Sequence, residues 1–253
     1  MMDGPQLFAR YAYPPNELGY CGPEDHLALL EYGDEGVSDP GLRGLARGFD
    51  GAWPYLELIA HANGISDPLD ARVVEAYWVG NRLLELVDAR AMGRYLEETF
   101  RARVGQRWAM LEEVVTAGSV PHHSFHVFAV YPWVGLLRAG RAEPLHVLDR
   151  CRVRWGRVRS VDGDLAVVAS RLLSWDGHAL SLGPVREEAV RAASGGRAFV
   201  HDLRPGERVA MHWDWICDRL DPSREAALRR YTRLHLDMVN SRLIHPGPAA
   251  VLA

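Results

Sequence analysis

Residues Cys151 to Val168, CRVRWGRVRSVDGDLAVV, decide the fold of the C-terminal half of the chain. Apolar and polar residues alternate on both sides of Asp162-Gly163, a dipeptide typical of tight turns between strands. The pattern predicts two antiparallel strands, each with one face in a core. With this pair included, we expect strands, separated by Gly- and Pro-containing turns, within residues 125–137, 144–158, 162–175, 199–203 and 207–216.

A helix is expected after the last strand. It begins at Asp221-Pro222-Ser223, where a capping carboxylate precedes a proline in the first turn. Apolar residues at helical spacing predict a buried face made by Leu228, Tyr231, Leu234 and Met238. Three arginines of the same helix fall off that face: Arg229, Arg230 and Arg233.

The N-terminal half has helical periodicity instead. Asp67-Pro68 predicts a helix start, after which apolar residues recur at Leu69, Val73, Tyr77, Leu84 and Val87. Other helices are expected over residues 23–32, 54–62, 92–103 and 107–115, with a loop-rich stretch from Gly33 to Asp50. The chain is therefore expected to be α+β, with a helical domain at 1–118, a β domain with its closing helix at 119–245 and a tail at 246–253.

Composition excludes several classes of protein. All 29 basic residues are arginine, and the absence of lysine rules out Walker-A phosphate binding, Schiff-base chemistry and attachment of pyridoxal phosphate. Three cysteines cannot form a disulfide framework, which favours free thiols in a reducing compartment. No apolar run approaches the about 20 residues of a membrane helix, and no signal-peptide pattern opens the chain. We expect a cytoplasmic protein without a membrane contact.

Charge is divided unevenly along the chain. Residues 1–145 carry a net charge of −8 and residues 146–253 one of +4, which together give the −4 of the whole chain. The division supports two units and suggests that the basic C-terminal one meets an acidic protein surface. It is too small to indicate binding to nucleic acid.

Two residues of the β domain have metal-binding chemistry. Cys151 shares a strand face with Trp155, and His212 shares one with Asp214. Taken alone, these patterns fit a packed thiol and a solvated polar face as well as a histidine ligand with a carboxylate behind it.

The order of the C-terminal pieces resembles the HypC/HupF family of nickel-iron hydrogenase maturation chaperones. The shared blocks are Cys-x-x-x-x-Gly-x-Val at 151–158, Asp-Gly-Asp-Leu-Ala-Val-Val at 162–168, Leu-x-Pro-Gly-Glu-x-Val-x-x-His at 203–212 and Arg-Leu-Asp at 219–221 before a helix. The resemblance implies a small OB-like β-barrel with a C-terminal helix. It also implies iron, bound transiently by Cys151 and His212, and a hydrogenase large-subunit precursor or another maturation protein as partner.

The chain departs from that family in four ways, one of which is that arginines replace apolar residues just after the cysteine. The family's cysteine follows the initiator methionine, whereas Cys151 is internal. Trp155 stands where the family usually has proline, and residues 169–198 form a longer segment. The turn glycines and alternating strands remain, so the expected fold is unchanged.

The N-terminal half contains secondary candidates for metal ligands. Its segments ARYAYPPNELGYCGP and PHHSFHVFAVYPW are similar to signatures of an uncharacterised family. In the second, His122, His123 and His126 would offer two imidazoles to one metal from either a helix or a strand, or would be a turn and a half-buried strand residue. In the first, Cys21 precedes an expected helix whose N-terminus would lower the thiol pKa, or it is a small residue in a Gly-Pro turn.

These observations leave three functional hypotheses. The first is a hydrogenase maturation factor, an accessory protein rather than an enzyme, whose barrel handles iron or docks on an immature large subunit. The second is a metal- or thiol-dependent enzyme that uses Cys21 with His122, His123 and His126. The third is a docking adaptor without metal.

Overall fold

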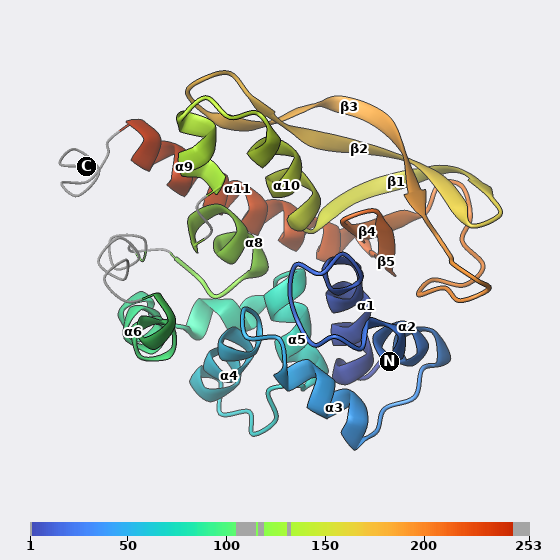
Figure 1. Ribbon diagram of the computed structural model, residues 1–253, viewed down its shortest axis with the longest axis horizontal. Coiled ribbons are helices and arrows are strands. Elements are labelled where there is room, and N and C mark those ends of the chain that lie inside the picture. Colours follow the sequence, from blue (N-terminus) through green and yellow to red (C-terminus); the bar gives the residue numbers. More distant parts are fainter. Residues whose placement is uncertain (1, 105–114, 116–118, 131–132, 245–253) are drawn as a thin grey trace.

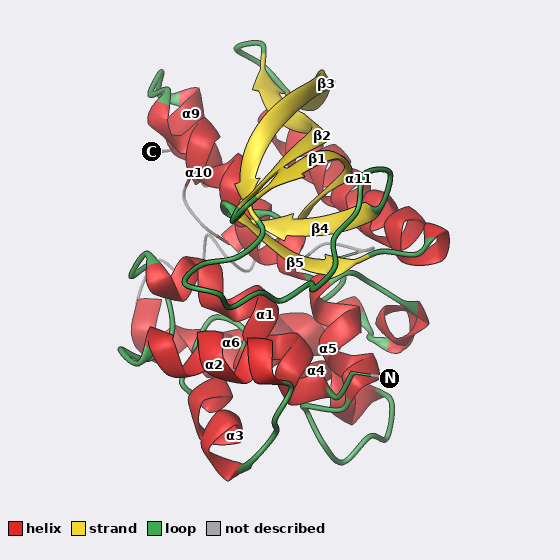
Figure 2. Ribbon diagram, turned by 90° about the vertical axis from the view of Figure 1, so that its right-hand side faces the viewer, coloured by secondary structure: helices red, strands yellow, loops and turns green. Residues whose placement is uncertain are grey.

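The computed structural model describes residues 2–104, 115, 119–130 and 133–244. The chain is α+β, with a layer of helices from its N-terminal half packed against a closed five-stranded barrel and a C-terminal helix (Figures 1 and 2). Among the described residues, no helix has both the length and the apolar character needed to cross a membrane.

The helical layer lies in the lower half of Figures 1 and 2. Its elements are α1 (Gly4–Glu17), α2 (His26–Glu35), α3 (Pro40–Arg47), α4 (Trp53–Ala62), α5 (Ala71–Trp78), η1 (Arg82–Leu86) and α6 (Ala89–Val104). Aspartates begin several of these helices, because a carboxylate before the first turn accepts a backbone N–H that has no other partner. The capping aspartates are Asp3, Asp25, Asp39 and Asp70.

Three expectations for this layer need correction. The helix expected from Asp67-Pro68 begins at Ala71, because Asp70 provides the capping oxygen. The stretch expected to be a loop between Gly33 and Asp50 contains α3, and α1 was not expected at all. The helix expected over residues 107–115 lies almost entirely outside the described residues.

Four helical elements lie between His123 and Cys151, where strands were expected over 125–137 and from 144 onward. They are α8 (His123–Phe125), the π-helix η3 (His126–Val130), α9 (Trp133–Arg138) and α10 (Glu143–Cys151). The apolar run over 125–137 was therefore wrongly assigned, because a short, fully buried helix and a buried strand have the same apolar pattern. The division into domains after residue 118 stays a prediction.

The barrel begins at residue 154. Its strands are β1 (Arg154–Asp162), β2 (Leu165–Trp175), β3 (Leu180–Arg191), β4 (Arg208–His212) and β5 (Trp215–Arg219), closed in the order β1-β2-β3-β5-β4. All pairs are antiparallel except β3 with β5. β3 was not expected, and residues 199–203, expected as a strand, form bends and a turn. The turn at Asp162-Gly163 is confirmed, with Gly163 at a positive φ of 56° that glycine adopts without strain.

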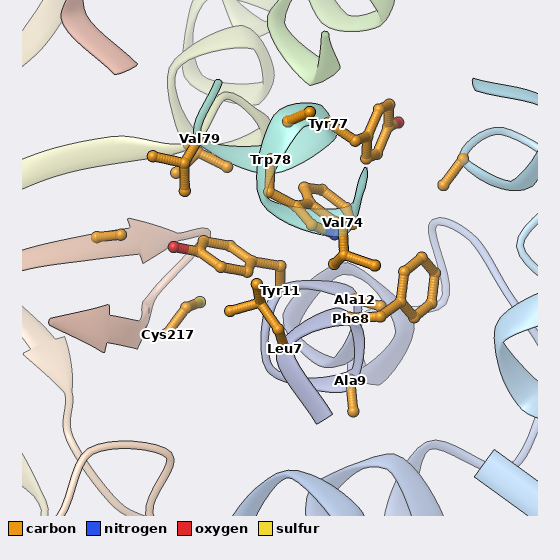
Figure 3. Close-up of a cluster of buried hydrophobic side chains, with 14 of the residues drawn as sticks. Leu7, Phe8, Ala9, Tyr11, Ala12, Val74, Tyr77, Trp78, Val79 and Cys217 are labelled. Carbon is orange, nitrogen blue, oxygen red and sulfur yellow. The ribbon is translucent and has the colours of Figure 1, made fainter. Parts of the chain in front are cut away.

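The helical layer and the barrel share one hydrophobic core. Figure 3 shows its centre, where Tyr11 of α1 lies between Trp78 of α5 and Cys217 of β5. The rings of Tyr11 and Trp78 are stacked at 5.5 Å. Glu17 extends the contact at the rim, since it accepts a hydrogen bond from the indole of Trp215 at 3.0 Å. Residues of the N-terminal helices α1 and α5 therefore pack against the barrel and form part of its core.

The expected closing helix is confirmed as α11 (Pro222–Ile244). It begins at Asp221, whose carboxylate accepts the backbone N–H groups of Ser223 and Arg224. Leu228 and Tyr231 are buried, whereas Leu234 and Met238 are half-buried against the same core.

Candidate metal centre

One ligand atom each from His123, Cys151 and His212 lies within 4.8 Å of the other two. The three residues come from α8, the last position of α10 and the last position of β4. The pair expected from the sequence, Cys151 with His212, therefore meets at one point, and His123 joins it. Three donors so close together can converge on a single metal ion.

His212 has the arrangement expected of a metal-ligating imidazole. Its side chain is fully buried, and its Nδ1–H donates to the backbone carbonyl of Tyr11 at 2.6 Å. Its Nε2 atom has no hydrogen-bond partner among the described residues. The Tyr11 bond fixes the proton on Nδ1 and leaves the Nε2 lone pair available.

Asp214 was expected to lie behind His212 as a hydrogen-bond acceptor, and this is wrong. The backbone turns at Trp213, which has a φ of 51°, and Asp214 is exposed and pairs with Arg150 at 3.2 Å. The strand alternation that placed His212 and Asp214 on one face ends at this turn.

His123 is held between the helical layer and α10. Its Nε2 lies 2.7 Å from the carbonyl oxygen of Cys151, and its Nδ1 lies 3.3 Å from the hydroxyl of Tyr77. Its ring meets that of His212 edge to face at 5.0 Å. Both nitrogens of His123 therefore have partners, and a metal would replace one of them.

Cys151 ends a helix and does not open a strand as expected. Burial raises the pKa of its thiol, and Cys21 nearby raises it further. Burial also lowers the pKa of His212 to about 4 and the pKa of His123 well below its usual value. At neutral pH the two imidazoles are therefore neutral donors, and a metal would displace the thiol proton.

A buried ion pair supports the turn that follows His212. The guanidinium of Arg154, which is fully buried, donates to the carbonyl of Trp213 and to the carboxylate of Glu188. Glu188 also pairs with Arg150 at 2.6 Å. Sequence reasoning missed this group. The sequence signal for this ion pair was the alternation of arginines after Cys151. Arg152 and Arg154 are both almost fully buried.

The other candidate histidines lie near this centre without joining it. The Nδ1 of His122 accepts the backbone N–H of Ser124 at 3.0 Å, and its ring stacks on Tyr231 at 5.3 Å. The Nδ1 of His126 lies 3.1 Å from the hydroxyl of Tyr55. Among the described residues, the only histidine of the 122–126 segment in the three-ligand cluster is therefore His123.

Cys21 does not have the lowered thiol pKa that the sequence suggested. Burial raises the pKa of Cys21 to about 12. The following helix, α2, begins only at His26, so its N-terminus is several residues away. Cys21 nevertheless lies beside the centre, in the wall of a cavity.

That cavity has a volume of about 150 Å³ and includes all three clustered side chains in its wall. Cys21 and His126 also line it, together with aromatic rings that include Phe49 and Trp133. At its edge, the exposed Tyr20 stacks on Trp213 at 4.4 Å. Three protein donors beside a small space are the arrangement of a metal site with an open coordination position.

The fold and the cluster define an α+β protein with a two-histidine, one-cysteine centre between a helical layer and a closed barrel, in which both histidines are buried and the cysteine is half-buried. The chain belongs to a family of unknown function, DUF6390, whose model matches residues 1–246. No curated protein and no solved structure gives a significant match to the chain.

Proposed function

We propose that this chain is a cytoplasmic accessory protein for the maturation of nickel-iron hydrogenases. Its barrel, of the OB-like kind, holds an iron ion between Cys151, His212 and His123. Its partners are an immature hydrogenase large subunit or another maturation protein.

The observation that carries this proposal is the Nε2 atom of His212, buried and without a partner beside Cys151 and His123. An orphaned polar atom in a protein interior is costly, and a bound metal ion removes that cost. Thiolate and imidazole are ligands that suit iron, zinc and copper. The resemblance of the C-terminal half to hydrogenase maturation chaperones favours iron among these metals.

The test is metal analysis of the full chain, purified without oxygen and supplied with Fe(II). We expect one iron per chain, and we expect Cys151→Ser, His212→Ala and His123→Ala each to lower the retained iron at least tenfold. His178→Ala is the matched control, because His178 is exposed in a turn and outside the cluster. Unchanged iron in Cys151→Ser would contradict the proposal. If the wild-type chain retains no metal, the iron proposal is wrong and the hypothesis of a docking adaptor without metal remains.

Bound metal should also stabilise the fold. A ligand at one hundred times its dissociation constant adds about 2.7 kcal/mol to the free energy of unfolding. For a chain of this size that corresponds to a rise of about 5 to 10 °C in Tm. We expect this rise in the wild type and not in His212→Ala, measured by calorimetry with and without Fe(II).

The cavity favours a second candidate, a metal- or thiol-dependent enzyme. Cys21 and His126 line the space beside the three clustered side chains, where a small substrate would meet a metal. Retention of zinc in preference to iron would support this candidate. The enzyme candidate also predicts that Cys21→Ser leaves the metal content unchanged, because Cys21 lies beside the three clustered residues and is not one of them.

A further inference from the structure

Two surface grooves of about 660 Å³ each run beside α11, away from the metal centre. They share Arg229, Arg233 and Asp237, so they flank the same row of side chains. We call the two together the α11 groove. None of the three clustered metal-site residues lines it.

The α11 groove is basic. Among the described residues that line it, five arginines face two carboxylates, namely Arg171, Arg208, Arg229, Arg230 and Arg233 against Glu225 and Asp237. Glu225 is already engaged, since it pairs with Arg208 at 2.8 Å and with Arg229 at 2.6 Å. An anionic partner would therefore find an excess of positive charge here.

Arg233 is the arginine of the groove that is most available to bind an anionic partner. It is exposed at the middle of the shared row, and within the described part of the chain it makes no hydrogen bond or ion pair. Arg229 beside it is already oriented, because its guanidinium lies 6.0 Å from the centre of the Trp155 ring. An ordered and a free guanidinium one helical turn apart can each bind a carboxylate.

The groove also has apolar walls and a defined length. Leu182 and Leu234, both half-buried, line it on the two sides of the row. The lining residues of α11 run from Pro222 to Asn240, which corresponds to about 27 Å at the rise of an α-helix. An extended peptide of about eight residues spans this length.

We propose that the α11 groove binds an acidic segment of a partner protein, about eight residues long, whose carboxylates meet Arg229 and Arg233 while apolar side chains contact the leucines. Charge complementarity carries this assignment, since both arginines lie on the surface of a chain half that is positive in net charge. The site is independent of the metal, so it stands or fails separately from the proposed function.

The experiment measures binding of a fluorescent eight-residue peptide in which four glutamates alternate with leucine and alanine. A second peptide carries glutamine at the four positions. We expect the full chain to bind the glutamate peptide at least tenfold more tightly, with an affinity that falls as salt is added. Equal binding of the two peptides, or binding of neither, would overturn the proposal.

Two double variants with the same change in net charge separate the groove from general electrostatics. The double variant Arg229→Glu with Arg233→Glu should bind the glutamate peptide at least tenfold more weakly than the wild type. Arg186 and Arg204 are exposed outside the groove, so the double variant Arg186→Glu with Arg204→Glu should keep the wild-type affinity. Both variants should keep the iron content of the wild type. Equal losses in the two variants, or tighter binding of a single-stranded oligonucleotide than of the peptide, would reject the acidic-peptide site.

Discussion

The free nitrogen of His212 depends on a residue distant in the sequence. The carbonyl of Tyr11 in α1 accepts a hydrogen bond from Nδ1–H, which keeps the proton on Nδ1 and leaves the lone pair of Nε2 free. Nothing near His212 in the sequence does this, since Asp214 lies outside. The tautomer of His212 is therefore set by the helical layer.

Glu188 is the residue whose loss should be most costly near the centre. Replacing it with glutamine would leave the fully buried guanidinium of Arg154 without its carboxylate. Breaking a buried pair in this way costs about 3 to 5 kcal/mol. We expect Glu188→Gln to lose that much free energy of unfolding in urea titrations. Glu187→Gln is the control, because Glu187 is exposed, and its effect should stay within about 0.5 kcal/mol.

The same residue predicts a dependence on pH. Burial alone would raise the pKa of Glu188, but Arg154, Ser170 and Arg150 outweigh it and hold that pKa below its usual value. The folded pKa is lower than the unfolded one, so ionised Glu188 stabilises the fold above the unfolded pKa. This contribution disappears as the pH falls through the folded pKa. Between neutral pH and pH 3, the wild type should therefore lose more stability than Glu188→Gln. Parallel losses would contradict this.

At this scale the sequence predicted part of the centre. Cys151 and His212 were paired through resemblance, and His123 was one of three histidines within five residues. The choice among those three depends on α8, a single turn of helix whose orientation is set by its neighbours. Periodicity over three residues does not predict that orientation.

Helices and strands could be predicted from the sequence only where apolar and polar residues alternate with the period of that element. α11 has apolar residues at helical spacing, of which Leu228 and Tyr231 are buried, and a capping aspartate, and it forms where expected. β3 was missed because most of its residues are exposed, so alternation does not mark it. The helices between His123 and Cys151 were mistaken for strands because a short run of fully buried apolar residues has the same pattern in either element.

Two of the four predicted core positions of α11, Leu228 and Leu234, differ in burial, and this predicts a graded effect. Leu228 is fully buried, so Leu228→Ala should cost about 2 to 5 kcal/mol. Leu234 is half-buried, so Leu234→Ala removes less apolar contact and should cost about 1 to 2 kcal/mol. Denaturant titration of both variants at one pH gives the comparison. An equal or reversed order would show that α11 packs differently.

Across the whole molecule, the sequence divides the chain in two, but one buried cluster contains residues from both parts. Tyr11 and Trp78 from the helical layer belong to the same buried cluster as Cys217 and Ile216 from the barrel. The sequence could not show this, because contacts between segments so far apart leave no local periodicity. A change in composition along a chain marks where element types change, which need not be where a core ends.

A shared core predicts that the chain unfolds as one unit. Cutting it would leave the barrel with exposed apolar surface where α1 packs, and His212 without the Tyr11 carbonyl. We expect far-UV circular dichroism, which reports helix, and fluorescence of the eight tryptophans, Trp78 and Trp215 among them, to give coincident transitions in urea. A fragment of residues 119–253 should bind a hydrophobic dye and lack fixed tertiary structure. A fragment that unfolds cooperatively, with the barrel signal of the full chain, would show instead that the barrel is an independent domain.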